Sequence, residues 1–290
     1  MKKKKSGTII LAHIIFIVFG ICCLVPMIYL ISASITNEQT LFVEGYKLFP
    51  KNIDFSAYKY LLRNPTQMLQ SYGVTIFITI VGTVLSLLVM LMIAYPLSIK
   101  SFKFKKSLSF YLFFTILFSG GLVPTYLMNV QYLHLKNNIL IYILPSLVNV
   151  WYVFMIRSFF SGIPEALRES AKIDGASEFR VLFNIIIPIS KPVIATIAFM
   201  EIMTRWGEWY NCSLYITKPE LQTVQYLLQA LMQESESVQL AQDAGVSIGD
   251  IPRETVKLAM AVIAAGPVMV IFPFFQKYFV KGMTVGSVKG

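Results

Sequence analysis

The feature that most constrains this chain is a series of apolar runs, each long enough to cross a lipid bilayer. A membrane-spanning helix needs about 20 mostly apolar residues, and six segments meet that length. They run approximately over Ile9–Ala33, Tyr72–Ile99, Leu108–Val130, Ile139–Phe160, Val193–Ile216 and Val256–Val280. The sequence therefore predicts an all-α integral membrane protein with six transmembrane helices, folded as a single transmembrane domain over residues 1–290.

The composition excludes the main alternatives. Hydrophobic residues make up 56% of the chain and charged residues 14%, whereas soluble domains carry about 25% charged residues. So little charge cannot coat a water-soluble particle of 290 residues. Because the apolar runs recur along the whole chain, a soluble enzyme with one anchor is excluded, and the high apolar and aromatic content excludes intrinsic disorder.

The distribution of basic residues predicts the orientation. With a cytoplasmic N-terminus, the inner segments carry 16 Lys and Arg residues and the outer segments carry 8. Basic residues favour the cytoplasmic side of a membrane, so both termini are expected in the cytoplasm, in a plasma or inner membrane. The net charge of +10 then reflects orientation, and no nucleic-acid partner is expected.

Two predicted outer segments are long, residues 34–71 and 217–254. The second places five apolar residues on one face of a predicted helix. These residues are Leu221, Val224, Leu227, Leu228 and Leu231. The two segments either form a docking surface or cap the helix bundle.

The cytoplasmic segment 162–191 has a pattern of its own. Pro164 suits the first position of a helix, and Asp174-Gly175 predicts a turn in which Gly175 takes a positive φ. A second short helix is expected to stop before Pro188. From these residues alone, a solvated connector and a docking element fit equally well.

The run Glu169–Ala176, which reads ESAKIDGA and is followed by Pro188, resembles the EAA loop of ABC-importer permeases. One departure is Ser170, where the family usually has alanine. The segments Phe118–Pro124, Trp206–Asn211 and 281–290 resemble the carbohydrate branch. Within that branch the chain is most similar to the maltose-permease half (MalG-like) and its LplC-type group.

The resemblance implies a type I ABC-importer permease that takes up sugars, as oligosaccharides or polysaccharide fragments, by alternating access. Its expected partners are a second homologous permease chain, two cytoplasmic ABC ATPase subunits and an extracytoplasmic sugar-binding protein. The chain has no G-x-x-x-x-G-K-[ST] phosphate loop, so ATP and Mg are expected on the ATPase, with no cofactor on this chain. A peptide or ion importer of the same architecture, a proton-coupled transporter and a membrane enzyme are the alternatives.

The resemblance also assigns residues to the ATPase contact. They are Glu165, Glu169, Ser170, Ala171, Asp174, Gly175, Ala176, Pro188, Lys289 and Gly290. The last two lie in the tail 281–290, which is rich in glycine and lacks an apolar stripe. This composition predicts a cytoplasmic tail that does not form a helix alone.

The fifth predicted span is unusual in its charge. Glu201, Arg205 and Glu208 share one face at helical spacing, as either a structural ion network or a polar lining of the translocation path. Trp206, Trp209, Tyr210 and Asn211 follow, as either an interfacial belt or flat faces for a sugar ring. No residue set predicts a metal site or a catalytic group.

Overall fold

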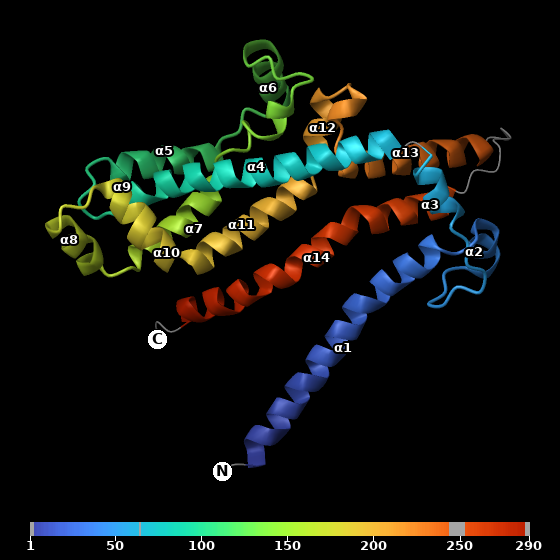
Figure 1. The fold of residues 1–290 in the computed structure, drawn as a ribbon, viewed down its shortest axis with the longest axis horizontal. Coiled ribbons are helices and arrows are strands. Elements are labelled where there is room, and N and C mark those ends of the chain that lie inside the picture. The colour runs from blue at the N-terminus through green and yellow to red at the C-terminus, as the bar shows by residue number, and fades with distance from the viewer. Residues whose placement is uncertain (1–2, 64, 244–252, 288–290) are drawn as a thin grey trace. The chain divides into compact units, whose positions relative to one another are not determined.

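The computed structural model describes residues 3–63, 65–243 and 253–287, and within these ranges the chain is helical without β-strands (Figure 1). One isolated bridge joins Thr36 and Ile53. The α-helices are α1 (Lys3–Ser34), α2 (Glu38–Glu44), α3 (Ser56–Leu61), α4 (Pro65–Ser98), α5 (Lys105–Leu117), α6 (Leu122–Leu127), α7 (Val150–Ser161), α8 (Glu165–Ile173), α9 (Glu178–Val181), α10 (Ile187–Ile189), α11 (Lys191–Trp206), α12 (Tyr210–Tyr215), α13 (Val224–Asp243) and α14 (Arg253–Ser287). Shorter turns are the π-helices η1 (Met128–Tyr132) and η3 (Leu182–Ile186) and the 3₁₀-helices η2 (Ile139–Tyr142) and η4 (Pro219–Leu221).

Three described helices are continuous and apolar enough to cross a bilayer: Ile9–Ser34, Pro65–Ser98 and Glu254–Gln276. They confirm the first, second and last predicted spans. Pro96 lies inside the second of these helices without ending it. Proline is tolerated in membrane helices where other groups take over the freed backbone partners.

The third predicted span is bent rather than straight, and a second bend lies just before the fifth. Lys105–Leu117 and Leu122–Tyr132 meet at 111°, and Glu178–Ile189 and Lys191–Trp206 meet at 84°. The first bend contains Gly121 at φ +84, a conformation that glycine adopts without a Cβ clash. Counting each bent pair as one span, the described residues contain five candidate spans.

The fourth predicted span, Ile139–Phe160, is wrong as a single helix. Its first part is the 3₁₀-helix η2, and a regular helix resumes only at α7. Asn149 starts α7, because its side-chain Oδ1 accepts hydrogen bonds from the N–H groups of Trp151 and Tyr152. Pro145, which lies between η2 and α7, has no N–H group to donate to a helical hydrogen bond. Apolar content alone did not reveal this break.

The contacts divide the chain into two compact units, the first made of residues 1–68 and 227–267. The outer segment 34–71 folds here into α2 and α3, and its core contains Ala57, Val256 and Ala259. The Glu38 carboxylate accepts hydrogen bonds from the N–H groups of Glu254 and Thr255, both at 2.9 Å. It therefore caps the start of α14, where the helix dipole favours a negative charge.

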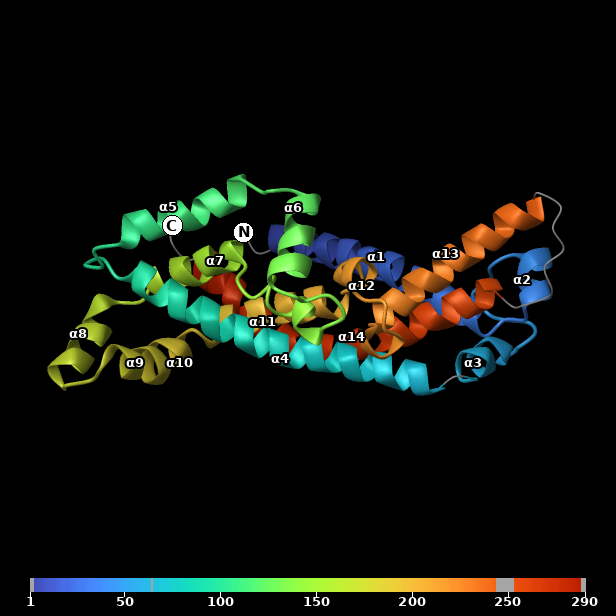
Figure 2. The ribbon, with the colours of Figure 1, turned by 90° about the horizontal axis from the view of Figure 1, so that it is seen from above.

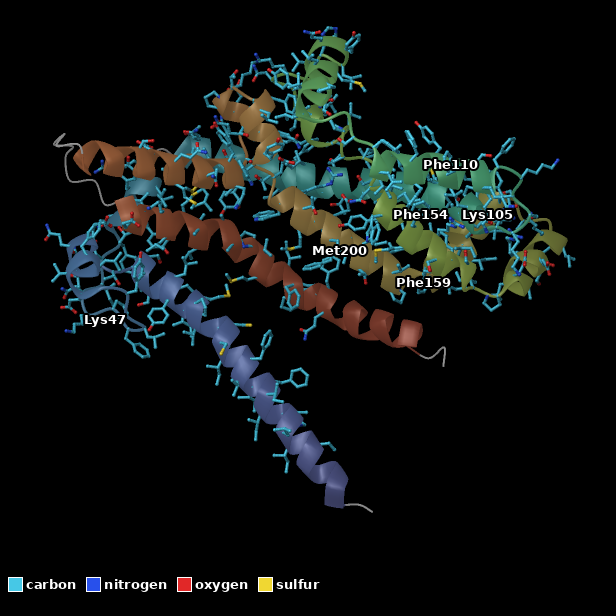
Figure 3. The ribbon with its side chains drawn as sticks, turned by 180° about the vertical axis from the view of Figure 1, so that it is seen from behind. Lys47, Lys105, Phe110, Phe154, Phe159 and Met200 are labelled. Atoms are coloured by element: carbon cyan, nitrogen blue, oxygen red, sulfur yellow. The ribbon has the colours of Figure 1, made fainter. Side chains whose placement is uncertain are left out.

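The second unit comprises residues 69–226 and 268–290. Helix α7 packs against both α5 and α11. Figure 3 labels one residue on each of these helices: Phe110 on α5, Phe159 on α7 and Met200 on α11. Two apolar clusters lie along α4, one around Ile78 and the other around Met90. Figures 1 and 2 show α8, α9 and α10 at the Ser98 end of α4.

Two further expectations concern helix ends. The helix predicted in the outer segment 217–254 is confirmed as α13. In the tail, residues 281–287 form no separate helix but continue α14. These residues extend an existing helix, so the cost of nucleation is already met. Lys289 and Gly290 lie outside the described residues.

Candidate functional site: the coupling loop and the Arg205 network

The segment 162–191, here called the coupling loop, forms the two short helices that its sequence predicts. Helix α8 ends in a Schellman motif: the Ala176 N–H donates to the Ala171 carbonyl at 2.9 Å and the Gly175 N–H donates to the Lys172 carbonyl at 3.0 Å. Gly175 has a φ of +79. Ser177 then caps α9 by accepting a hydrogen bond from the Arg180 N–H. The turn thus depends on a left-handed residue at Gly175.

The second helical stretch differs from expectation at Pro188. It does not stop before this proline but continues through the π-helix η3 into α10, which contains Pro188. The N–H of Ile187 donates to the carbonyl of Leu182, a π-type bond that shifts the hydrogen-bond register just ahead of the proline. The 84° bend to α11 follows at Ser190.

Polar side chains hold the coupling loop to α4. The Tyr95 hydroxyl of α4 donates to the Glu178 carboxylate at 2.5 Å, and Lys172 forms an ion pair with the same carboxylate. At the start of α8, Glu165 pairs with Arg168 at 3.0 Å and with Lys100 at 3.3 Å. The loop is therefore anchored at both of its helices.

Apolar side chains of the coupling loop divide into two sets. Ala171, Val181 and Leu182 are buried in the cluster around Met90. Ile173 and Phe179, on either side of the turn, are 87% and 63% exposed. Exposed apolar residues beside an anchored turn are typical of a protein contact surface.

The predicted coupling residues have different places. Glu165, Glu169, Ser170 and Ala171 lie on α8, and Asp174, Gly175 and Ala176 form the turn. Pro188 lies on α10, beyond the π-helix. The first seven thus lie along α8 and its turn, with Ala171 buried in the cluster around Met90, while Pro188 lies further along the chain.

The second candidate site is a hydrogen-bond network around Arg205, which is 3% exposed. Its Nε donates to the Glu201 carboxylate at 3.2 Å. Its Nη1 donates to the Tyr142 carbonyl at 3.0 Å and to the Ser146 Oγ at 3.3 Å. Its Nη2 donates to the Ser86 Oγ at 2.6 Å and to the Ser146 carbonyl at 3.2 Å. Of the two acids that share its predicted face, Arg205 thus pairs with Glu201.

This network explains how the broken fourth span is stabilised. Non-helical backbone at membrane depth needs partners from protein or water. Arg205 supplies them to the carbonyls of Tyr142, the last residue of η2, and of Ser146, which lies between η2 and α7. Gly82 of α4 provides the space that the guanidinium occupies, because a Cβ at this position would lie 2.5 Å from the Arg205 Nη1.

The remaining predicted residues of the fifth span lie at the end of its helix, at Trp206, or beyond it. Helix α11 ends at Trp206, so Glu208 is in the following turn, where its carboxylate accepts two hydrogen bonds from Asn211. Trp206 is buried and tilted against Tyr72. Trp209 and Tyr210 are exposed and contact each other edge to face.

A cavity of about 410 Å³ lies beside the charged residues, and its lining does not include Trp206, Trp209, Tyr210 or Asn211. Its walls include Glu201, Arg205 and Glu208, so the three charged residues come together although the helix ends before the third. Sequence reasoning missed the contributions of Ser86, Ser146 and Gly82. Their signal was weak, because small residues are ordinary in membrane helices.

The bent and broken apolar helices, together with the anchored turn, define the class of a multi-pass membrane transport subunit. Residues 10–285 match the family described as the inner membrane component of binding-protein-dependent transport systems. The chain belongs to this family, which makes it a transport permease subunit of the inner membrane.

The relatives and solved structures agree with this membership. The chain is 38% identical over 298 residues to Protein LplC of Bacillus subtilis (strain 168), covering 100% of this chain and 98% of LplC. It is 34% identical to the polygalacturonan/rhamnogalacturonan transport system permease protein YtcP of the same organism, covering 94% and 95%. A bacterial ABC transporter involved in the import of the acidic polysaccharide alginate has a similar structure, with a TM-score of 0.80 and 28% identity, covering 96% and 99%. The expected all-α permease fold is confirmed.

Proposed function

We propose that this chain is one permease subunit of an ATP-driven importer of oligosaccharides. A second homologous permease chain would complete the translocation path, and an extracytoplasmic sugar-binding protein would deliver the cargo. Two cytoplasmic ATPase subunits would bind ATP and Mg and drive the change between inward-open and outward-open states. Both termini of this chain would lie in the cytoplasm, as the distribution of Lys and Arg predicts.

The observation that carries the proposal is the coupling loop. It exposes Ile173 and Phe179 at a turn whose second helix is fixed to α4 through Glu178. Its first helix pairs through Glu165 with Lys100, just after the end of α4. A surface that is apolar at its tip and anchored at its base transmits the movement of a bound partner, since it cannot fold away independently. The ATPase subunit is the partner that an importer without its own phosphate loop requires.

An oligosaccharide cargo is supported by the relatives. Besides YtcP, similar chains include the arabinooligosaccharides transport system permease protein AraQ of Bacillus subtilis (strain 168), at 27% identity over 280 residues. Proton-coupled transport requires a carboxylate that is free to change its protonation. Glu201, the acid on α11, is instead paired with Arg205.

The test is a substitution at Gly175. The turn needs a positive φ, and a Cβ at this position meets no atom within 4 Å. Gly175→Val places a β-branched residue in a left-handed conformation that it strongly disfavours, so the turn should distort. We expect the variant to insert in the membrane, to retain little ATPase subunit on purification and to lose ATP-dependent sugar uptake.

Gly175→Asn is the matched control, because asparagine tolerates the left-handed conformation. It should retain ATPase binding and uptake. If Gly175→Val co-purifies with a full complement of ATPase and transports normally, the coupling loop is only a connector and the proposed function loses its support.

A further inference from the structure

The cavity beside Arg205 has a chemistry that indicates which sugars it can hold. Besides the three charged residues, it is lined by Thr115, Ser146, Asn149, Trp151 and Thr204, which are all exposed, among others. All of these residues belong to the second compact unit. The cavity is therefore a property of this chain, open on the side where these exposed residues lie.

The Arg205 guanidinium in the cavity has no free N–H donor for a ligand. A guanidinium has five N–H donors. Arg205 uses one on Glu201, two on the Tyr142 carbonyl and the Ser146 hydroxyl, and two on the Ser86 hydroxyl and the Ser146 carbonyl. Among the described residues that line the cavity, Arg205 is the only cation. A cargo carboxylate would therefore find no unoccupied cationic donor on this wall.

Most other polar groups of the wall are acceptors, and the donors among them, the Asn149 amide and the Trp151 indole N–H, carry no charge. Glu201 and Glu208 present carboxylates. The hydroxyls of Thr115 and Thr204 donate to carbonyls of their own helices, at 2.7 Å and 3.0 Å, so their lone pairs face outward as acceptors. Sugar hydroxyls can donate to such groups. A carboxylate would be repelled by Glu208, because the charge of Arg205 balances only that of Glu201.

An aromatic side chain completes the wall. Trp151, at the start of α7, is 67% exposed although it lines the cavity. An indole ring offers a large flat apolar face, which suits the C–H face of a sugar ring.

We propose that this cavity is a cargo subsite for neutral oligosaccharides and that the carboxylate of Glu208 excludes sugars that carry carboxylates. The inference rests on the proposed function and deepens it by naming the cargo class. It would distinguish this chain from its structural neighbour, which is involved in the import of an acidic polysaccharide.

The experiment uses the complete reconstituted complex in proteoliposomes. The probes are neutral arabino-, galacto- and malto-tetrasaccharides and the acidic tetragalacturonate. Binding to the complex is measured by equilibrium dialysis without the binding protein, so that the selectivity of that protein does not enter. ATP-dependent uptake is measured in parallel with the binding protein present.

We expect the wild-type complex to bind at least one neutral tetrasaccharide and to bind tetragalacturonate more than tenfold more weakly, since single pocket contacts change specificity by about 10- to 200-fold. Trp151→Ala should lower the affinity for the neutral tetrasaccharide by about tenfold or more. Glu208→Gln should bind tetragalacturonate more tightly than the wild type does, which reduces the difference in affinity between the neutral and the acidic sugars. Phe110→Ala is the matched control, because Phe110 on α5 is 69% exposed and does not line the cavity, and it should behave as wild type.

Two results would overturn the inference: equal binding of tetragalacturonate and the neutral sugars by the wild type, or unchanged neutral-sugar binding in Trp151→Ala. If ATP-dependent uptake of a neutral sugar persists in either case, the proposed function stands and only the subsite is wrong. If no sugar of either class is taken up by the wild type, the proposed function itself fails.

Discussion

Arg205 of α11 donates a hydrogen bond of 2.6 Å to Ser86 of α4, and this contact lies on α4 between the two apolar clusters of the second unit. The guanidinium approaches α4 at Gly82, where a Cβ would lie 2.5 Å from Nη1, 2.8 Å from Cζ and 2.9 Å from Nε. The close approach of the two helices therefore depends on a glycine at this position.

Gly82→Ala should for this reason destabilise the subunit, because the guanidinium must move and lose hydrogen bonds to buried groups, each worth about 1–3 kcal/mol. Gly73→Ala on the same helix is the control, since a Cβ there meets nothing within 4 Å and alanine favours a helix by about 1 kcal/mol over glycine. Thermal unfolding in detergent compares the two. Equal melting temperatures for both variants would contradict this account.

Arg205→Ala should destabilise the subunit by about 3–5 kcal/mol, because it leaves Glu201 buried without its partner. The double variant Arg205→Ala with Glu201→Gln removes the unpaired charge and should recover part of the loss. The carbonyls of Tyr142 and Ser146 stay without their donor in both variants, so recovery should be incomplete. Subunit yield and unfolding of the single and double variants measure this, and full recovery would show that the backbone contacts contribute little.

The sequence predicted the long helices and the coupling loop because their signals are local. Apolar length identified α1, α4 and α14, and Asp174-Gly175 identified the turn. The break in the fourth span was missed, because it depends on a partner distant in the chain: the carbonyls before α7 are satisfied by Arg205. The end of α11 before Glu208 was missed since Gly207 alone is a weak stop signal in a membrane helix.

The topology is tested by reporter fusions. We expect fusions at Asn52 and Gln239 to report the outer side of the membrane and fusions at Lys103 and Glu178 to report the cytoplasm, from the excess of basic residues on the inner segments. Substituted-cysteine labelling at the same positions is an independent check. A cytoplasmic signal at Gln239 would contradict the orientation.

Asp54 predicts a pH dependence in the outer segment. Its carboxylate accepts hydrogen bonds from the Ser56 N–H at 2.8 Å and from the Asn37 amide at 3.0 Å, and the bond from the Ser56 backbone holds the pKa of Asp54 below its ordinary value. A carboxyl with a lowered folded pKa adds stability above its unfolded pKa of about 3.9, and that stability is lost as the pH falls through the folded pKa.

Proteolysis within residues 38–63 should therefore be steady from about pH 8 to pH 5 and increase below about pH 4. Asp54→Asn should be cleaved faster already at neutral pH, because its amide N–H₂ opposes that of Asn37, and it should lack the acid step. Identical pH curves for the wild type and Asp54→Asn would assign the step to other carboxylates.

The hydrogen bond from Tyr95 to Glu178 predicts a separation of ATPase binding from transport. Tyr95→Phe removes only the hydroxyl that ties α4 to α9, and a hydrogen bond to a charged group contributes about 1.5–3 kcal/mol. The exposed surface of Ile173 and Phe179 stays in place, so the ATPase should still bind. Because the anchor between the loop and α4 is weaker, sugar uptake per ATP hydrolysed should fall.

Tyr132→Phe is the control, since Tyr132 is 78% exposed and lies outside the coupling loop. Proteoliposomes measure both rates, and an unchanged ratio of uptake to hydrolysis in Tyr95→Phe would show that the anchor at Glu178 does not transmit the movement.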